Sequence, residues 1–203
     1  GTMMVKEFER EPSGPADAVW VVLDLDSRMQ GGTGANNSTE YSVTIAASVT
    51  KRFLDAGRTV GLVVNGTEEQ LVRAAAGVGQ LGRIFTALAL AEPGDGTVFD
   101  VAEITVNELT PGTSAIVISS AAPADVAAAG QLLETNGAGV VPIIVEASSF
   151  EGKRHADGAS YQVAGANFDP YVVHMDDEIE LRLDYRVHGP SPTAGAVPVQ
   201  DVL

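Results

Sequence analysis

The sequence predicts an α/β protein whose central sheet is doubly wound and mostly parallel, with helices on both of its faces. Two observations support this prediction: four apolar runs of six residues each, and segments of helical length between them. Continuous apolar runs are typical of strands buried on both sides, which occur in the middle of parallel sheets. When such strands are connected through helices, right-handed crossovers place helices on both faces of the sheet.

The first half of the expected core supplies two strands with a helix between them. Residues 18–23 form the first apolar run. Ser38 or Thr39 is the expected N-cap of the following helix, because a hydroxyl there accepts a hydrogen bond from the first turn. Gly57 is the expected end of this helix, because glycine readily adopts the left-handed conformation that terminates helices. Residues 59–64 then form the second strand.

The second half of the expected core adds two more strands and three helices. Apolar residues at helical spacing predict helices over residues 80–91 and 98–109. Residues 114–119 form the third apolar run. A helix should open at Pro123, which is tolerated in the first turn, and end near Gly137. The last element of this half is the fourth strand, over residues 140–145.

A further strand is expected near the end of the chain. Residues 151–165 are polar and rich in turn formers, whereas residues 179–187 alternate strictly between apolar and charged side chains. Such alternation is typical of a half-buried strand with a charged outer face. We expect an added strand at a sheet edge, for which residues 5–11 are a candidate partner.

The length of the chain and its hydrophobic content suit one domain. With 203 residues, 45% of them hydrophobic, the chain can bury one sizeable core. We expect that domain to span residues 5–188. Residues 1–4 look like a cloning remnant and start, which suggests a segment cut from a longer protein, and residues 189–203 like a poorly ordered tail. Because no apolar run of about 18 residues occurs, we expect no direct membrane insertion of this segment.

Charge and cysteine content exclude several classes of function. Twenty-seven acidic and twelve basic side chains give a net charge of −15. This charge repels phosphate backbones and anionic lipids, so nucleic acid is not an expected partner. The chain has no cysteine. Disulfides, thiolate zinc sites, iron–sulfur clusters and cysteine nucleophiles are therefore excluded.

Four passages resemble a known bacterial family. They are residues 5–10, 20–26, 38–41 and 57–62. Together they are similar to the von Willebrand factor A-like domain of the bacterial domain-of-unknown-function family 58. The resemblance implies a von Willebrand factor A-like fold and a membrane-associated parent protein, with this domain on the cytoplasmic face. It implies no known activity, because the family has none assigned. Our leading hypothesis is a non-catalytic protein-interaction module, and the resemblance implies a protein partner such as a MoxR-type ATPase.

The resemblance also implies where a metal ion would bind. Domains of the wider class hold a divalent ion in an Asp-x-Ser-x-Ser loop after the first strand, with a threonine and an aspartate from later loops. Here Asp24 occupies the first position, Asp26 the second and Arg28 the third. Ser119 and Ser120 stand where the class usually has its aspartate. No threonine can be assigned from the sequence, so the metal-dependent adhesion site is degenerate.

Three interpretations of this loop stay open. Asp24 and Asp26 suffice to anchor a magnesium ion that keeps several of its waters. Arg28 can instead neutralise the carboxylates in a salt bridge and leave no metal, which we favour. The aspartates can also merely cap a turn. We therefore expect no cofactor or a weakly bound magnesium ion, with Asp24 and Asp26 as the metal ligands. The predicted binding surface comprises Asp24, Asp26, Ser27, Arg28, Ser119 and Ser120.

An alternative from another class is a nucleotide- or small-molecule-binding α/β enzyme. Residues 77–82 match the G-x-G-x-x-G fingerprint, and Asp100 follows at the distance of a ribose-binding acid. The fingerprint should join an apolar strand to a helix in the first βαβ unit, whereas residues 71–76 are a poor strand and two strands precede them. We therefore favour the interaction module over the enzyme. The three histidines, His155, His174 and His188, lack the spacing of a zinc pair.

Overall fold

The structure of the protein is a computed structural model that describes residues 18–34, 36–152 and 170–177. Several expectations fall outside these ranges. They concern the pairing of residues 5–11 with an alternating strand at 179–187, the cloning remnant at 1–4 and the tail at 189–203. These expectations stay predictions.

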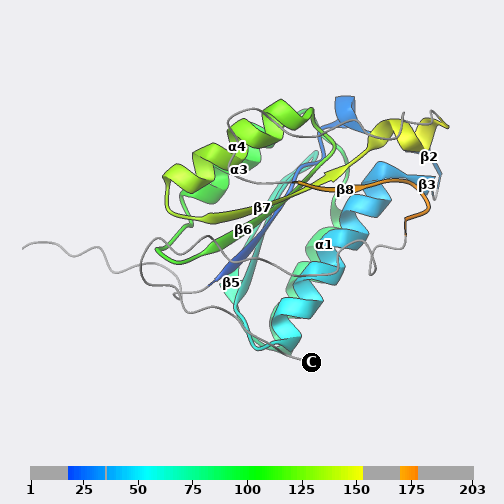
Figure 1. The fold of residues 1–203 in the computed structure, drawn as a ribbon. Helices are drawn as coiled ribbons and strands as arrows, with labels where there is room; N and C mark the ends of the chain where they lie inside the picture. The colour runs from blue at the N-terminus through cyan, green and yellow to red at the C-terminus, as the bar shows by residue number, and fades with distance from the viewer. Residues whose placement is uncertain (1–17, 35, 153–169, 178–203) are drawn as a thin grey trace, which may run out of the picture.

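A six-stranded sheet forms the centre of the molecule (Figure 1), in the order β5-β4-β1-β6-β7-β8. The two neighbours of β1 both run parallel to it, with Val21 opposite Leu62 on one side and Ile116 on the other. Only the β4–β5 pair is antiparallel. The prediction of a mostly parallel sheet is therefore confirmed. The strands are β1 (Val19–Leu23), β4 (Val60–Asn65), β5 (Glu69–Ala75), β6 (Ser114–Ser119), β7 (Gly139–Val145) and β8 (Tyr171–Val173).

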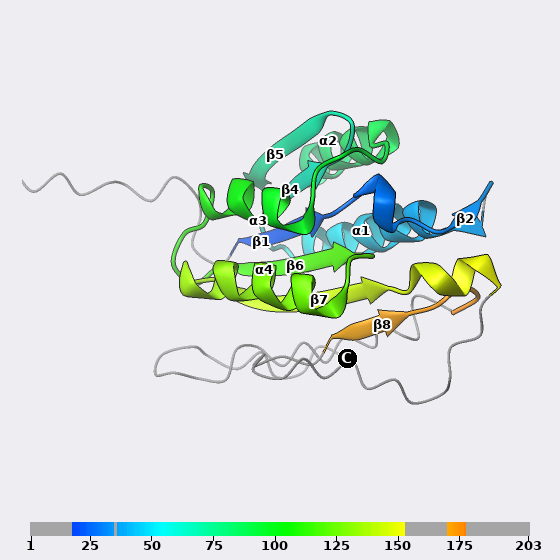
Figure 2. The same cartoon turned by 90° about the horizontal axis from the view of Figure 1, so that it is seen from above.

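Two helices cover each face of the sheet, as a doubly wound fold requires (Figures 1 and 2). Successive residues of β1 serve the two layers in turn: Val21 and Leu23 belong to the core under α1 and α2, while Trp20 and Val22 belong to the core under α3 and α4. All five residues of β1 are buried. The helices are α1 (Ser38–Asp55), α2 (Val78–Leu90), α3 (Val98–Val106) and α4 (Pro123–Thr135), with smaller elements η1 (Ser27–Met29), β2 (Gly32–Thr33), β3 (Asn36–Asn37) and η2 (Ala147–Glu151).

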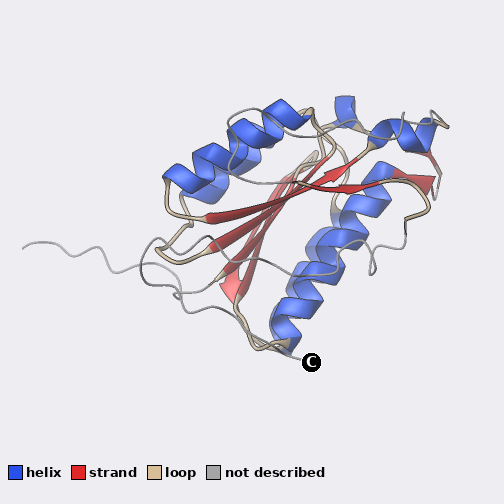
Figure 3. Ribbon diagram, viewed as in Figure 1, coloured by secondary structure: helices blue, strands red, loops and turns tan. Residues whose placement is uncertain are grey.

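The strand order creates a crevice at the carboxyl end of β1. The chain passes from β1 through α1 to β4 on one side, and later returns to β6 on the other side of β1. At such a switch point the loops after neighbouring strands diverge, and ligands of open α/β sheets bind there. The segments following β1, β4 and β6 are therefore placed together. Figure 3 shows these loops at the same end of the sheet.

The predictions for strand positions were wrong at both edges of the sheet. Residues 71–76 were expected to be a poor strand, yet they overlap β5, which pairs with β4 as a hairpin. Strand β8 was not predicted. The residues of an edge strand are only partly buried, so their apolar pattern is weak. Their strand conformation depends on pairing with a neighbouring strand, which the local sequence does not reveal. A seven-residue edge strand and a three-residue one therefore give weak local signals.

The ends of the helices follow the predicted chemistry with one correction. Gly57 and Gly137 have left-handed backbones, with φ of 75° and 92°, as expected of residues that follow a helix. The N-cap of α1, however, is Asn37, whose side-chain oxygen accepts a hydrogen bond from the Glu40 amide at 2.8 Å. Ser38, one of the predicted caps, is buried and binds the Gly31 amide instead. Asparagine is an equally good cap, which is why sequence alone did not separate these neighbours.

One glycine in the sheet is required by a close approach. A Cβ atom on Gly61 of β4 would lie 2.5 Å from the ring of Trp20 on the neighbouring strand. Gly82, on the outer side of α2, has nothing within 4 Å of the corresponding position. The two glycines therefore have opposite structural roles.

We expect Gly61→Ala to lower the free energy of unfolding by about 1–3 kcal/mol, because the Trp20 ring must shift in a packed core. Gly82→Ala should raise it by up to about 1 kcal/mol, because alanine favours the helical conformation without a clash. Urea unfolding followed by the fluorescence of Trp20, the single tryptophan, measures both values. Equal effects of the two substitutions would contradict the close packing of Gly61 on the ring.

Candidate functional site

Three polar side chains meet at the switch point, one from each of three neighbouring strands. Asp24 directly follows β1, Asn65 ends β4 and Ser119 ends β6. All three residues are buried. Parallel pairing brings these strand ends to the same edge of the sheet, on either side of β1. The three residues form the base of the candidate site.

Asp24 is wholly buried and is held by hydrogen bonds on both carboxylate oxygens. Its Oδ1 accepts a bond from Asn65 Nδ2 at 2.7 Å and a longer one from the Asp26 amide at 3.2 Å. Its Oδ2 accepts a bond from Ser119 Oγ at 2.6 Å. Burial raises the pKa of Asp24 above its ordinary value, although these three bonds act in the opposite direction.

Asn65 connects three loops and was missed by the sequence prediction, which took it only as a turn former. Its side-chain oxygen accepts a bond from the Leu25 amide at 2.7 Å. Its Nδ2 group also donates to the main-chain oxygen of Thr97 at 2.8 Å. The available signal was its place at the carboxyl end of a buried strand, which Asp24 and Ser119 share. Asn65 thus fixes the loops after β1 and before α3 against each other.

Thr97 is the threonine that the structure brings to this site, and the sequence did not identify it. It caps α3, and its Oγ1 donates to Asp100 Oδ2 at 2.8 Å. The Thr97 amide donates to the same carboxylate oxygen at 2.6 Å. These bonds hold the pKa of Asp100 below its ordinary value. Asp100, proposed as a ribose-binding acid in the alternative hypothesis, therefore serves a capping box.

Asp26 and Arg28 form a two-pronged ion pair beside this cluster. Arg28 Nε donates to Asp26 Oδ1 at 2.8 Å, and Nη2 donates to Oδ2 at 2.7 Å. The Asp26 side chain is 7% exposed, whereas that of Arg28 is 61% exposed. Asp26 also caps η1 by accepting the Arg28 amide at 3.0 Å, which brings the two side chains together. The bond to the guanidinium holds the pKa of Asp26 below its ordinary value, and raises that of Arg28.

The remaining predicted site residues lie around this pair. Ser27 is exposed. Ser120 is half-buried, and its Oγ atom is buried without a hydrogen-bond partner among the described residues. Ser120 and Arg28 both line a groove of about 320 Å³ that continues to Glu146 and Glu151. The structure therefore places the six predicted residues at one edge of the sheet. Asp24 bonds to Ser119 and to the Asp26 amide, Asp26 bonds to Arg28, and no bond joins Ser27 or Ser120 to the other four.

The arranged oxygens do not fit a divalent cation. Magnesium requires several free oxygen ligands in a near-octahedral set. Both oxygens of Asp24 and both oxygens of Asp26 already accept hydrogen bonds, and Ser119 Oγ donates to one carboxylate. Within residues 18–34, 36–152 and 170–177, no group of three histidine or acidic side chains is placed to hold a metal. A metal would have to displace the Arg28 guanidinium or the Asn65 amide.

The glycine-rich segment of the alternative hypothesis lies at the opposite edge of the sheet from Asp24. It follows β5, whose last residue, Ala75, pairs with Val60 at the start of β4. Within that segment, Gly82 faces open space, whereas a dinucleotide fingerprint uses its third glycine for close helix packing. The segment does join a strand to a helix, but that strand is the antiparallel edge strand β5 and not the first strand of a parallel βαβ unit, as nucleotide binding requires. Of the three histidines, His174 alone lies in the described part, with Nδ1 3.4 Å from Asp177 Oδ2.

We expect Asp24→Ala to lower the free energy of unfolding by about 2–4 kcal/mol, because Asn65 and Ser119 each lose a buried acceptor. Asp24→Asn should cost far less, since it retains an acceptor oxygen and Ser119 can accept as well as donate. A folded-state pKa raised above 3.8 stabilises the protein at low pH and loses that contribution as pH rises. The wild type should therefore gain stability relative to Asp24→Asn between pH 7 and pH 4. Urea unfolding at both values tests this sign; a relative loss would contradict it.

The described helices include none long and apolar enough to cross a membrane. Comparison with curated proteins found no match to this chain. The solved structures that this chain resembles include the following three. BatB from Bacteroides thetaiotaomicron is 16% identical, with a TM-score of 0.48 over 64% of this chain and 67% of that one. An aerotolerance-related membrane protein from Bacteroides fragilis is 15% identical, with a TM-score of 0.44 over 76% of each chain.

The pilus adhesin SpaC from Lactobacillus rhamnosus GG is 11% identical, with a TM-score of 0.50 over 67% of this chain and 25% of that one. At such identities the likeness concerns the fold. The model of the family described as "Protein of unknown function DUF58" matches residues 1–136. The predicted family is confirmed: the chain belongs to the DUF58 family.

Proposed function

We propose that this chain is a non-catalytic protein-interaction module of a larger, membrane-associated bacterial protein. Its binding surface consists of the loops after β1 and β6. The observation that best supports this surface is the Arg28 guanidinium, which is 61% exposed while the Asp26 carboxylate that holds it is 7% exposed. A cation fixed by two hydrogen bonds at the switch point offers a partner an oriented group at little entropic cost.

The site works without a metal in this proposal. In the wider class a divalent cation balances the carboxylates of the first loop and offers its open position to the partner. Here Arg28 balances Asp26, and hydrogen bonds from Asn65 and Ser119 satisfy Asp24. The first loop is then a degenerate adhesion site in which Arg28, and not a metal ion, supplies the positive charge.

The environment of the carboxylates supports a binding role over catalysis. A general acid or base needs to reach its substrate within hydrogen-bond distance. Asp24, which has a raised pKa, is wholly buried, and its oxygens accept bonds from three groups of the protein. Asp26 has a lowered pKa and is paired with Arg28. Neither carboxylate is free to exchange a proton with a bound substrate.

The partner and location follow from the family resemblance. A MoxR-type ATPase of the same bacterium is the proposed partner, and the cytoplasmic face of the membrane is the proposed location of the parent protein. Nucleic acid is not a proposed partner, because the net charge of −15 opposes binding to phosphate backbones.

We expect the immobilised domain to bind that ATPase in biolayer interferometry, and Arg28→Ala to weaken binding at least about ten-fold, as loss of a central arginine does at other interfaces. Lys51→Ala is the matched control, because Lys51 is an exposed cation on α1 that pairs only with Asp55. Circular dichroism should confirm that both variants fold. Equal binding by wild type and Arg28→Ala would remove the loop after β1 from the interface.

We expect no saturable heat when the chelator-treated wild type is titrated with magnesium or manganese. The double substitution Arg28→Ser and Ser119→Asp should create binding, because it removes the competing cation and adds a carboxylate at the end of β6. Adding Asp24→Ala to that double variant is the control and should abolish the heat. Saturable binding by the wild type that is lost in Asp24→Ala would show that a metal displaces Arg28 after all.

A further inference from the structure

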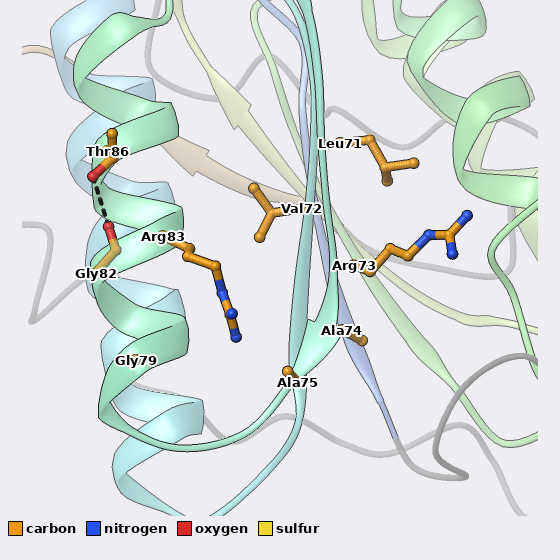
Figure 4. A pocket seen from close by; sticks show the side chains of 9 residues that line it. All are labelled: Leu71, Val72, Arg73, Ala74, Ala75, Gly79, Gly82, Arg83 and Thr86. Carbon is orange, nitrogen blue, oxygen red and sulfur yellow. Dashed lines mark hydrogen bonds between the residues drawn. The ribbon is translucent and has the colours of Figure 1, made fainter.

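A second surface, separate from the loops after β1 and β6, lies at the β5 edge of the sheet. Strand β5 pairs with β4 on one side, and no described strand pairs with its other side. A groove of about 880 Å³ runs between this strand and α2. It is lined by β5 from Leu71 to Ala75 and by Gly79, Gly82, Arg83 and Thr86 of α2 (Figure 4).

The helix side of the groove leaves room for a chain to approach. Cβ atoms placed on Gly79 or Gly82 would meet nothing within 4 Å. Figure 4 shows Val72 directed from β5 towards α2, with Leu71 and Arg73 on the other side of the strand. Leu71 is 39% exposed. An open backbone edge beside a shallow apolar trough is the geometry that binds an extended segment by strand addition.

The charge of the groove opposes that of the rest of the chain. Its lining includes Arg73 and Arg83 and no acidic residue, although the chain has 27 acidic and 12 basic side chains. Arg83 Nε donates to the neutral Gln80 side chain at 3.0 Å. Arg73 Nε lies 3.8 Å from Glu108 Oε2, a long distance for an ion pair, and the Arg73 side chain is 80% exposed. Both guanidinium groups therefore keep donors for an incoming carboxylate.

We propose that this groove binds an extended, acidic segment of a partner protein, which adds as a strand beside β5. Main-chain hydrogen bonds align the segment along the β5 edge that no described strand pairs, apart from Arg73 O, which accepts a bond from Gln80 Nε2 at 2.9 Å. Carboxylates of the segment pair with Arg73 on the face of β5 away from α2, and the alternate small or β-branched side chains lie against Val72 and the two glycines of α2. A second copy of the chain is disfavoured as the occupant because two molecules of charge −15 repel each other.

The probe is a fluorescein-labelled peptide of eight residues that alternates valine and glutamate. We expect the wild-type chain to bind it in fluorescence anisotropy about ten-fold more tightly than the matched peptide with glutamine in place of glutamate. A third peptide, N-methylated at every residue, should not bind, because it has no main-chain N–H group to donate to the strand edge.

Substitutions on α2 test the location without disturbing the core. Gly82→Trp should abolish binding of the glutamate peptide by filling the groove, whereas Gly82→Ala, at the same open position, should retain it. Arg73→Glu, on the exposed face of β5, should weaken binding about ten-fold or more, and Arg28→Ala, at the other surface, should leave it unchanged. Absence of wild-type binding, or equal binding by wild type and Gly82→Trp, would overturn the proposal. So would concentration-dependent dimerisation in sedimentation analysis that Gly82→Trp abolishes, since the occupant would then be a second copy.

Discussion

The arrangement of the site depends on one constraint: a carboxylate is wholly buried at the end of the central strand. An ionised carboxylate without partners in a protein interior costs several kcal/mol, so Asp24 requires donors from its surroundings. The strands that flank β1 in the sheet are β4 and β6, and each ends in a side chain, Asn65 or Ser119, that donates to Asp24. The need to satisfy one buried group therefore fixes the relative positions of three strand ends and of the loops that follow them.

Asp26, the second carboxylate, also needs its charge balanced, but this happens in a different way. Asp26 lies nearer the surface, where a charge can be balanced by an ion pair whose other member stays solvated. Arg28 keeps 61% of its side chain exposed while its guanidinium occupies both oxygens of Asp26. A metal ion would have to compete for the Asp26 carboxylate with the Arg28 guanidinium, which belongs to the same short loop. A bound metal and the Arg28 guanidinium are thus alternatives at Asp26.

Local pattern predicted the buried strands and long helices because burial imposes a periodicity on the sequence itself. Local pattern did not single out Asp24 and Ser119, which came from the resemblance to the family and the positions of its metal ligands. It failed for Asn65 and Thr97, because their roles depend on contacts between residues 41 and 32 positions apart, respectively. Strand β5 was missed for a similar reason: its residues are partly exposed, and its pairing with β4 is what makes it a strand.

The same α/β architecture places two chemically different surfaces at two sheet margins. The margin at the strand carboxyl ends gathers carboxylates because it is there that buried strands emerge and side chains can share donors from neighbouring loops. The β5 margin has no such convergence, and its lining consists of small, apolar and basic residues. Electrostatic complementarity mainly determines which partner binds and how fast it associates. A partner with an exposed acidic strand is therefore directed to the β5 margin, whereas the carboxylate-rich margin opposes it except at Arg28. An acidic partner therefore chooses between the two surfaces as much through its repulsion from the carboxylate-rich margin as through its attraction to the β5 margin.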